Sequence, residues 1–280
     1  MSRELVDELF PQLEPRDVVT IEEGWDSLVL DVDGEWIVRI PRRQPVRECL
    51  AMELRLLPEL APALPVPVPR FERVADGLGA VAYPKLEGDP VDVSRSSLGA
   101  QLGRFLVALH AFPVEQAREL GVPSDDLGWR ANYEAFARGL LGRVGPMLGD
   151  DRERAEAMLA DFLDDPANFE FEPRLLHADL GPAHILARGD ELTGIIDWSD
   201  ARIGDPALDL AWALNGTPRA FAEAVLAAYG SNDARLTERA LFFHRLGPWY
   251  ELHYGVHFHQ PAYVESGLAG VRSRLPAPLR

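Results

Sequence analysis

Lysine and cysteine are almost missing from this sequence of 280 residues. Lys85 is the one lysine, whereas arginine occurs 27 times. Cys49 is the one cysteine, so no internal disulfide can form and a reducing compartment is expected. No apolar run approaches the ~18 residues of a membrane-spanning helix, and the start of the sequence lacks the basic-then-apolar layout of a signal peptide. We therefore expect a cytoplasmic protein without a membrane partner.

Basic residues are also few in relation to acidic ones. The 28 lysines and arginines face 45 aspartates and glutamates, which gives a formal net charge of −17. Nucleic acids and anionic membranes bind basic surfaces, so neither is expected as a partner. Apolar residues make up 47% of the chain, which is typical of a globular protein, and the length allows one large domain or two lobes.

The first part of the chain has the pattern of short strands. Residues Ser27–Val32 and Glu35–Ile40 alternate between apolar and polar positions, and Asp33-Gly34 separates them. An Asp-Gly pair between two alternating runs predicts a β-hairpin. In the second strand, one face is apolar and is made by Trp36, Val38 and Ile40, so Arg39 lies on the other face.

A helix is expected after this hairpin. Residues 46–57 have helical spacing, and Glu53 is a carboxylate on their apolar stripe. A buried carboxylate needs a cationic partner, and Arg39 is available on the preceding strand. The proline-rich segment Pro58–Pro69 is expected to be extended, because proline interrupts helices.

The sequence indicates an α+β chain of two lobes. A short buried strand at Gly79–Pro84 precedes a polar, turn-rich segment at Lys85–Pro90, where we place the boundary. The lobes are then a small β-rich one at residues 1–86 and a larger, mainly helical one at 87–280. In the second lobe, a further β-hairpin is expected within Ile185–Ile196.

Three residues around this second hairpin carry the chemistry. The stretch HADLGPAHILARGDELTGIIDWSDARIGDPALDL, which begins at His177, contains Asp179, His184 and Asp197. His184 and Asp197 directly flank the hairpin, so its closure should bring them side by side. Asp179 is a short loop away. Two carboxylates with a further ligand predict a site for a divalent metal and a general base.

Neighbouring polar residues of the same stretch are expected to be structural. His177 would orient the loop through hydrogen bonds, and Asp205 would hold loop backbone. Asp209 is expected to be a helix N-cap or a buried acceptor, and His110 a histidine at a helix end.

The order of these motifs resembles the antibiotic kinases, the aminoglycoside and macrolide phosphotransferases. The resemblance covers WIVRIPRR, MELRLLPELAPALPVPVP, VAYPKLEGDP, VALHAFP and the stretch from His177 onward. It implies a bilobal protein-kinase-like fold with a nucleotide-binding N-lobe. It also implies that Asp179 orients the acceptor hydroxyl and takes its proton, that Asp197 holds Mg²⁺, and that His184 is a metal ligand at a position where many members have asparagine.

The resemblance also implies a nucleotide site for ATP or GTP. Arg39 would replace the lysine that most relatives pair with a helix glutamate, here Glu53. Residues 22–27 would form the loop over the phosphates, with the Ser27 hydroxyl as a contact, although three acids there are poor phosphate ligands. The purine would hydrogen-bond to backbone near Tyr83, Lys85 and Leu86.

The acceptor pocket is expected near the end of the chain. Trp249, Tyr250 and Glu251 are the candidates there, since similar kinases line the pocket with this region. Asp200 is a further substrate candidate, and a solvated pair with Arg202 is an equally good interpretation. We expect a monomer or a homodimer.

The sequence therefore predicts an O-phosphotransferase that acts on a hydroxyl of a small-molecule antibiotic. An aminoglycoside is the first acceptor, because its amines need carboxylates. A macrolide or a metabolite such as an amino alcohol or a sugar is the alternative, since the fold alone cannot decide. The absence of the usual lysine leaves a non-catalytic nucleotide- or antibiotic-binding protein as a further possibility.

Overall fold

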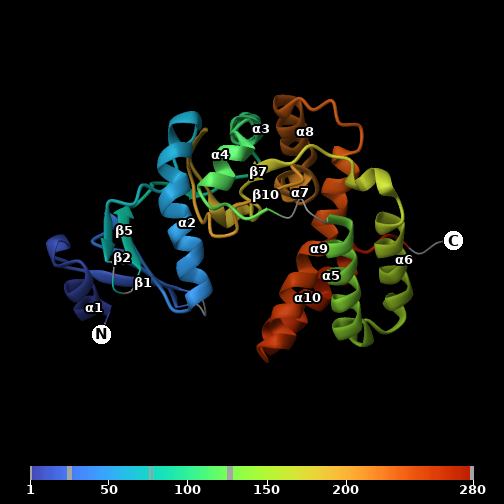
Figure 1. The fold of residues 1–280 in the computed structure, drawn as a ribbon, viewed down its shortest axis with the longest axis horizontal. Helices are drawn as coiled ribbons and strands as arrows, with labels where there is room; N and C mark the ends of the chain where they lie inside the picture. Colours follow the sequence, from blue (N-terminus) through green and yellow to red (C-terminus); the bar gives the residue numbers. More distant parts are fainter. Residues whose placement is uncertain (1, 24–26, 76, 78, 125–128, 278–280) are drawn as a thin grey trace.

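An antiparallel sheet of five strands forms one end of the molecule, at the left in Figure 1. The computed structural model describes residues 2–23, 27–75, 77, 79–124 and 129–277. The spatial order of the strands is β1 (Val18–Glu23), β2 (Ser27–Val32), β3 (Trp36–Pro41), β5 (Ala80–Pro84) and β4 (Arg73–Ala75). Helix α1 (Ser2–Leu9) and the 3₁₀ turn η1 (Pro11–Leu13) precede the sheet.

The hairpin of β2 and β3 is the one predicted from the Asp-Gly pair. Asp33 and Gly34 both have positive φ values, 58° and 72°, which aspartate and glycine tolerate better than most residues. Val38 and Ile40 of β3 face a small core. This core consists of Val6, Phe10, Leu30, Val32, Val38, Ile40, Ala80 and Ala82. Arg39 therefore faces the opposite side of the sheet.

Helix α2 (Gln44–Leu60) is longer than the sequence pattern predicts. It continues through Pro58 and is followed by η2 (Ala61–Ala63), so the extended connector begins later than Pro58. Pro58 lies near the C-terminal end of the helix, where its missing N–H removes a single helical bond. Leu56, Leu57 and Leu60 are buried in the core of the helical part, and the free energy of their burial offsets the loss of that hydrogen bond.

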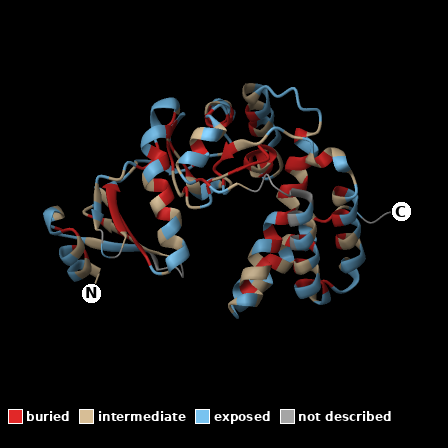
Figure 2. Cartoon of the chain, viewed as in Figure 1, coloured by how far each residue is buried: buried red, intermediate tan, exposed pale blue. Residues whose placement is uncertain are grey.

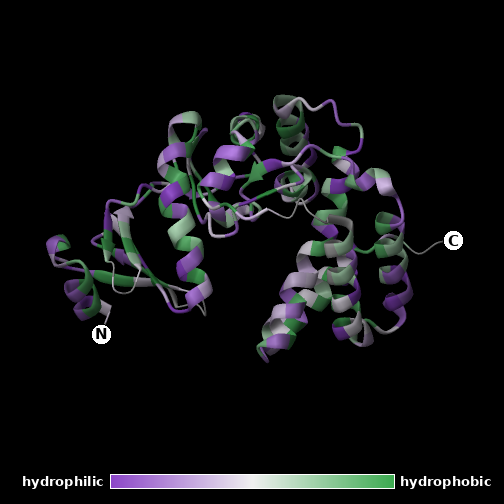
Figure 3. Cartoon of the chain, in the orientation of Figure 1, coloured by the Kyte–Doolittle hydropathy of each residue, from purple (hydrophilic) through white to green (hydrophobic). Residues whose placement is uncertain are grey.

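The rest of the chain is mainly helical. Its helices are α3 (Ser96–His110), α4 (Val114–Glu119), α5 (Trp129–Val144), α6 (Arg152–Leu163), α7 (Ala207–Asn215), α8 (Arg219–Tyr229), α9 (Leu236–His257) and α10 (Pro261–Arg274). Short 3₁₀ turns are η3 (Gly145–Met147), η4 (Gly149–Asp151), η5 (Pro166–Phe169) and η6 (Pro182–His184). Figure 2 shows buried and exposed segments following one another along the long helices, and Figure 3 shows hydrophilic and hydrophobic residues alternating along α2.

Two small sheets lie between the ends of the molecule. β7 (Arg174–Leu176) pairs with β10 (Arg202–Gly204), and β8 (Ile185–Arg188) pairs with both β6 (Asp89–Pro90) and β9 (Glu191–Ile195). The chain thus leaves the large sheet at Pro84 and enters a different one at Asp89. The boundary at residues 86/87 stays a prediction, because the C-terminal half of α2 packs into the core of the helical part.

Among the described residues, no helix is both long enough and apolar enough to span a membrane.

Candidate active site

The hairpin of β8 and β9 brings His184 and Asp197 together. His184 directly precedes β8, and Asp197 follows β9 after Ile196. The Ile196 amide donates to the His184 carbonyl at 2.9 Å and closes the base of the hairpin. His184 Nε2 lies 3.8 Å from Asp197 Oδ2. The proximity predicted from the sequence is therefore confirmed, because the two ends of a hairpin meet.

Asp179 lies in the loop that joins β7 to η6, beside His184. His184 Nδ1 donates to the backbone carbonyl of Asp179 at 2.7 Å and lies 3.5 Å from its Oδ2. Because a carbonyl only accepts, Nδ1 carries a proton, and Nε2 is the ring nitrogen that faces Asp197. All three predicted residues thus meet at one place.

The environment of Asp179 favours proton acceptance. Partial burial, together with the negative charges of Asp200 and Asp197, raises the pKa of Asp179 to about 6, although His184 opposes the shift. A carboxylate with a pKa just below neutrality is ionised at pH 7 and is a stronger base than an ordinary aspartate.

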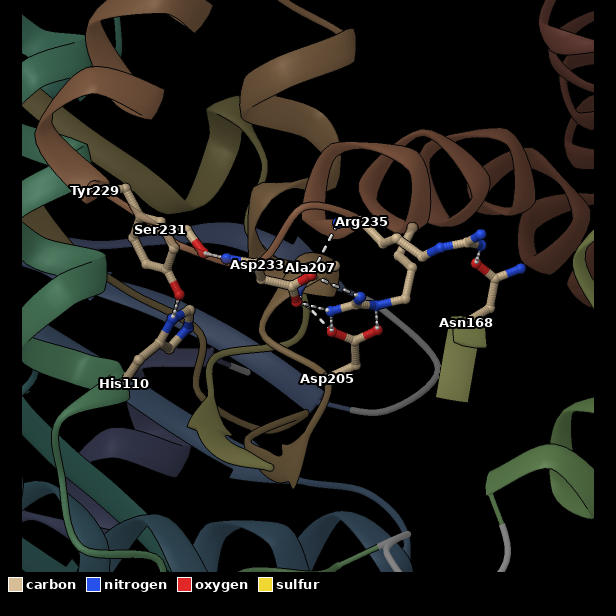
Figure 4. Close-up of polar contacts among 9 residues, drawn as sticks. His110, Asn168, Asp205, Ala207, Tyr229, Ser231, Asp233 and Arg235 are labelled. Carbon is tan, nitrogen blue, oxygen red and sulfur yellow. Dashed lines mark hydrogen bonds and ion pairs between the residues drawn. The ribbon is translucent and has the colours of Figure 1, made fainter. Parts of the chain in front are cut away.

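Asp209 anchors the backbone that precedes Asp179. Its carboxylate accepts from the amides of His177 (2.9 Å) and Ala178 (2.7 Å), and it also contacts His110 Nε2 at 3.1 Å. Ala178 has a φ of 69°, a conformation that costs a non-glycine residue about 1–2 kcal/mol and that Asp209 holds in place. His110 Nδ1 in turn contacts the Tyr229 hydroxyl at 2.8 Å (Figure 4). Asp209 is therefore a buried acceptor, one of its two predicted roles.

His177 supports the loop from within, as predicted. Its ring is fully buried, Nε2 donates to the Ile196 carbonyl at 3.0 Å, and Nδ1 accepts from the Asp179 amide at 3.3 Å. Burial lowers the pKa of His177, so the ring stays neutral. The neutral His177 ring, with Nε2 as donor and Nδ1 as acceptor, links the loop that contains Asp179 to the β8–β9 hairpin that precedes Asp197.

Asp205 has the structural role that the sequence predicts, and it has a partner that the sequence does not reveal. Its carboxylate accepts from the Ala207 amide at 3.0 Å and from the guanidinium of Arg239 at 2.7 and 3.0 Å. Arg239 also donates to Asp233 at 2.7 Å (Figure 4). This buried pair fixes α7 against α9 behind the site.

Arg39 connects the sheet to the site. Its NH1 donates to Glu53 Oε2 at 2.9 Å, and its NH2 lies 3.9 Å from Asp197 Oδ1. The Glu53 side chain is 0% exposed and that of Arg39 is 11% exposed. Although burial opposes it, the Glu53 carboxylate raises the pKa of Arg39 above its ordinary value. The ion pair predicted from the two periodicities is present, and it places a permanent cation beside Asp197.

The carboxylate of Asp197 is the donor here that suits Mg²⁺, a cation that prefers oxygen ligands. Asp197 Oδ1 accepts from the Ser199 hydroxyl at 2.8 Å, which leaves Oδ2 facing Nε2 of His184. Although burial opposes it, Arg39 and Ser199 lower the pKa of Asp197, so this carboxylate is ionised. In the described residues no group of three or more His, Cys, Asp or Glu side chains forms a complete metal cluster. Mg²⁺ commonly takes one or two protein ligands and completes its shell with phosphates and water.

A pocket of about 370 Å³ opens beside Asp179. Its polar lining consists of Asp179, Asp200, Arg202, His244 and Arg274. Its apolar lining consists mainly of Leu180, Leu208, Trp212, Phe243 and Tyr250. The size is within the ~300–1,000 Å³ of small-molecule sites.

The pocket contains Tyr250 but neither of its predicted neighbours. Tyr250 is 51% exposed, whereas Trp249 is 1% exposed and lies in the core. Glu251 accepts from the Ser266 hydroxyl at 2.6 Å and joins α9 to α10. Successive helical residues point about 100° apart, so three in a row cannot share one pocket. The structure thus places Asp200 and Tyr250 in the lining of this pocket and Trp249 and Glu251 outside it, and the substrate contacts of Asp200 and Tyr250 stay a prediction.

The residues predicted to bind the nucleotide lie on the five-stranded sheet and directly after β5. Ser27 begins β2 opposite Pro41, and residues 24–26 of the predicted phosphate loop lie outside the described part of the chain. Tyr83 pairs with Ile37, on the same face of the sheet as Arg39. Burial raises the pKa of Tyr83 to about 12.

Lys85 contacts the sheet with both its backbone amide and its side-chain ammonium group. Its amide donates to the Glu35 carbonyl at 2.8 Å, and its Nζ contacts Asp31 Oδ2 at 2.5 Å. Leu86 packs against Gly194 of β9, where a Cβ would come within 2.9 Å of the leucine side chain. Lys85 therefore stabilises the five-stranded sheet, and Leu86 contacts β9 in the helical part of the chain.

Sequence reasoning missed Arg274, His244, Trp212 and Phe243 in the pocket. They belong to α7, α9 and α10, far from Asp179 along the chain. No local motif marks them, and only the packing of these helices brings them to the pocket.

Comparison with known proteins now identifies the family. Residues 17–243 match the sequence model described as the phosphotransferase enzyme family. The chain belongs to this family. An uncharacterized Bacillus subtilis (strain 168) protein, YcbJ, is 28% identical over 67% of this chain, and a homoserine kinase of Methylobacterium nodulans is 31% identical over 71%. The matches span 66% and 65% of those two proteins, just under two thirds of their length.

Solved phosphotransferases have the same architecture. The GDP and kanamycin complex of APH(2")-IIia is 27% identical, with a TM-score of 0.88 and 97% of each chain covered. The macrolide 2'-phosphotransferase MphH from Brachybacterium faecium, as apoenzyme, is 29% identical, with a TM-score of 0.76, covering 99% of this chain and 100% of that one. The predicted resemblance and the kinase-like fold of this phosphotransferase family member are confirmed.

Proposed function

We propose that the protein transfers the γ-phosphoryl group of ATP or GTP to a hydroxyl group of a small molecule bound in the pocket beside Asp179. The observation that carries this proposal is the convergence of Asp179, His184, Asp197 and Arg39. Arg39 comes from the five-stranded sheet and the other three from the segment that contains the β8–β9 hairpin. His184 lies 3.5 Å from Asp179 and 3.8 Å from Asp197, and Arg39 lies 3.9 Å from Asp197. Phosphoryl transfer depends mainly on positioning and on charge stabilisation, which such a cluster supplies.

Each residue has one task in this reaction. Asp179 accepts the proton of the acceptor hydroxyl. The hydroxyl oxygen bonds to the γ-phosphorus, and the bond between the γ-phosphorus and the β–γ bridging oxygen breaks, which releases the nucleoside diphosphate. Arg39, held by Glu53, binds phosphate oxygens of the nucleotide. Asp197 and His184 Nε2 would hold Mg²⁺, which neutralises phosphate charge when bound.

The segment that follows β5, which we call the hinge and which contains Lys85 and Leu86, and the strand β2 complete the nucleotide site in this proposal. Lys85 uses its amide within the sheet, so the Leu86 amide is the donor we assign to the purine, next to the Tyr83 ring. Ser27 contacts the phosphates from the start of β2.

Three acceptor classes have support. An aminoglycoside, the first expectation, is supported by the similarity to APH(2")-IIia and by Asp179 and Asp200 in the pocket. A macrolide is supported by the similarity to MphH and by the apolar wall. A small metabolite such as L-homoserine is supported by the homoserine kinase relatives and by the modest pocket volume.

Turnover by the purified protein tests the reaction class. We expect nucleoside diphosphate release with ATP or GTP that depends on Mg²⁺ and on an acceptor from a panel of aminoglycosides, macrolides, hydroxy amino acids and sugars. Asp179→Ala abolishes it, whereas Glu191→Ala, an exposed carboxylate on β9, leaves it unchanged. Tight nucleotide or antibiotic binding without any turnover would instead establish the non-catalytic alternative.

A further inference from the structure

The charges in the acceptor pocket are almost all paired within the protein. Arg202 NH2 lies 3.3 Å from Asp200 Oδ1, so each of these two has a partner of opposite charge. His244 contributes no charge, because burial and the nearby Arg274 and Arg245 lower its pKa to about 4. Among the described lining residues, two charges remain without an ion-pair partner from an arginine or a carboxylate: the carboxylate of Asp179, which takes the acceptor proton, and the guanidinium of Arg274.

Arg274 is half-buried at the C-terminal end of α10. Its NH1 donates to the His244 carbonyl at 2.6 Å, and no carboxylate among the described residues forms an ion pair with it. Burial lowers the pKa of this guanidinium below its ordinary value, although the charge of Glu251 acts on Arg274 from a distance and opposes the shift. The other arginines buried near the site each have one: Arg39 pairs with Glu53 at 2.9 Å and Arg239 with Asp205 at 2.7 Å. A guanidinium withdrawn from water without a carboxylate is costly, and an anionic ligand relieves that cost.

The same pocket is poorly suited to a polycation. Among the described residues that line the pocket, a ligand with several ammonium groups would find one carboxylate without an ion-pair partner from arginine, Asp179, and it would face the guanidinium of Arg274 across a small space. Like charges in a confined, partly dehydrated site repel strongly. The net charge of −17 belongs to the whole chain and is not concentrated in this pocket.

We propose that Arg274 binds a carboxylate, or an equivalent anionic group, of the acceptor, so that the substrate is a small hydroxy acid and not a polycationic antibiotic. This inference rests on the proposed phosphotransferase function and names the acceptor class of that same site. The hydroxyl of the acceptor lies at Asp179, its anionic group lies at Arg274, and its carbon skeleton lies against the apolar wall of Trp212 and Phe243.

Paired acceptors test the inference directly. L-Serine, L-threonine and L-homoserine are compared with their primary amides, which keep the hydroxyl and the amine but lose the negative charge. Kanamycin serves as a polycation without a carboxylate. We expect the best hydroxy acid to be phosphorylated with at least a tenfold higher kcat/KM than its amide, and kanamycin to be a poor substrate.

Variants of two arginines on α10 provide the matched control. Arg274→Gln should raise the KM for the hydroxy acid roughly 10- to 100-fold, as expected when a charged hydrogen bond is lost, and should leave the KM for its amide unchanged. Arg274→Lys keeps the charge and should recover part of the loss. Arg272→Gln alters a neighbour that contacts Asp151 and the Met147 carbonyl outside the pocket, and it should behave as the unmodified protein.

The outcomes separate the inference from the function on which it rests. Phosphorylation of kanamycin in preference to every hydroxy acid, or equal losses in Arg274→Gln for acid and amide, would overturn the inference and leave the phosphotransferase function intact. A rise in the KM for ATP in Arg274→Gln, with the acceptor KM unchanged, would also overturn it, because the anion would then be a nucleotide phosphate. No turnover of any acceptor would overturn the proposed function and the inference with it.

Discussion

The ion pair of Arg39 and Glu53 allows the sharpest prediction about stability. Arg39→Met preserves most of the side-chain volume and removes the charge, so Glu53 is left without a partner at 0% exposure. An isolated carboxylate in such a place is expected to take up a proton. Glu53 has an ordinary pKa of 4.5, so protonating it at pH 7 costs about 3.4 kcal/mol, from 2.5 pH units at ~1.36 kcal/mol each.

We expect Arg39→Met to lose about 3–4 kcal/mol of unfolding free energy at pH 7. This value agrees with the ~3–5 kcal/mol typical of breaking a buried pair, and it is a large share of the ~5–15 kcal/mol of a whole domain. Urea denaturation followed by tryptophan fluorescence measures it. The double variant Arg39→Met/Glu53→Leu removes both charges and should regain stability to within about 1 kcal/mol of the unmodified protein.

The loss should also depend on pH. In Arg39→Met, the folded state holds a proton on Glu53 that the unfolded state releases above pH 4.5, so the stability of this variant rises as the pH falls. Between pH 7 and pH 5.5 the recovery should be about 2 kcal/mol relative to the unmodified protein. A loss below about 1 kcal/mol at pH 7, a loss that does not shrink at pH 5.5, or a double variant as unstable as the single one would refute this reasoning.

Three further changes probe the site and its support. Asp179→Asn should lower kcat at least ~100-fold and shift the melting temperature by only a few degrees, because this side chain is more than half exposed; a fully active variant would contradict its role as the base. For His244, the folded pKa of about 4 lies below the ordinary 6.5, so the unfolded state binds the proton first and stability falls as the pH drops from 6.5 toward 4. Because the ring is partly exposed, we expect a loss of about 1–2 kcal/mol, and urea titrations of His244→Asn should lack that part of the pH dependence. Tyr229→Phe removes the hydroxyl that contacts His110 at 2.8 Å and should lower kcat about three- to tenfold through a looser Asp209 anchor, with the KM for ATP unchanged; an equal change in both parameters would place the effect on binding.

Much of the site could be predicted from the sequence because its chemistry depends on local geometry. The β8–β9 hairpin has a short loop, and closing it brings its flanking residues His184 and Asp197 together whatever surrounds it. The period of two in β3 places Arg39 opposite the apolar face, and the helical period of α2 places Glu53 on a buried stripe. A buried charge requires a partner, and this requirement agrees with the resemblance, which pairs the same two residues.

The acceptor pocket could not be predicted in the same way. Helical spacing shows that Trp249, Tyr250 and Glu251 point in three directions, but only the packing of α9 against α10 decides that Tyr250 faces the pocket and Trp249 the core. Lys85 at the hinge could have served a nucleotide, and its engagement with Asp31 follows from the pairing of distant strands.

The sequence by itself indicated the kinase-like fold and the family through the resemblance of its motifs to the antibiotic kinases. It determined the meeting of Asp179, His184 and Asp197 because a short hairpin and a short loop join them. Only the tertiary structure decided which charges remain unpaired beside Asp179. Arg274 lies 95 positions after Asp179 and reaches the pocket because α10 folds back along α9. Whether a charge is neutralised depends on the charges of every element that packs near it. Their combined electrostatic effect exists only in the folded chain.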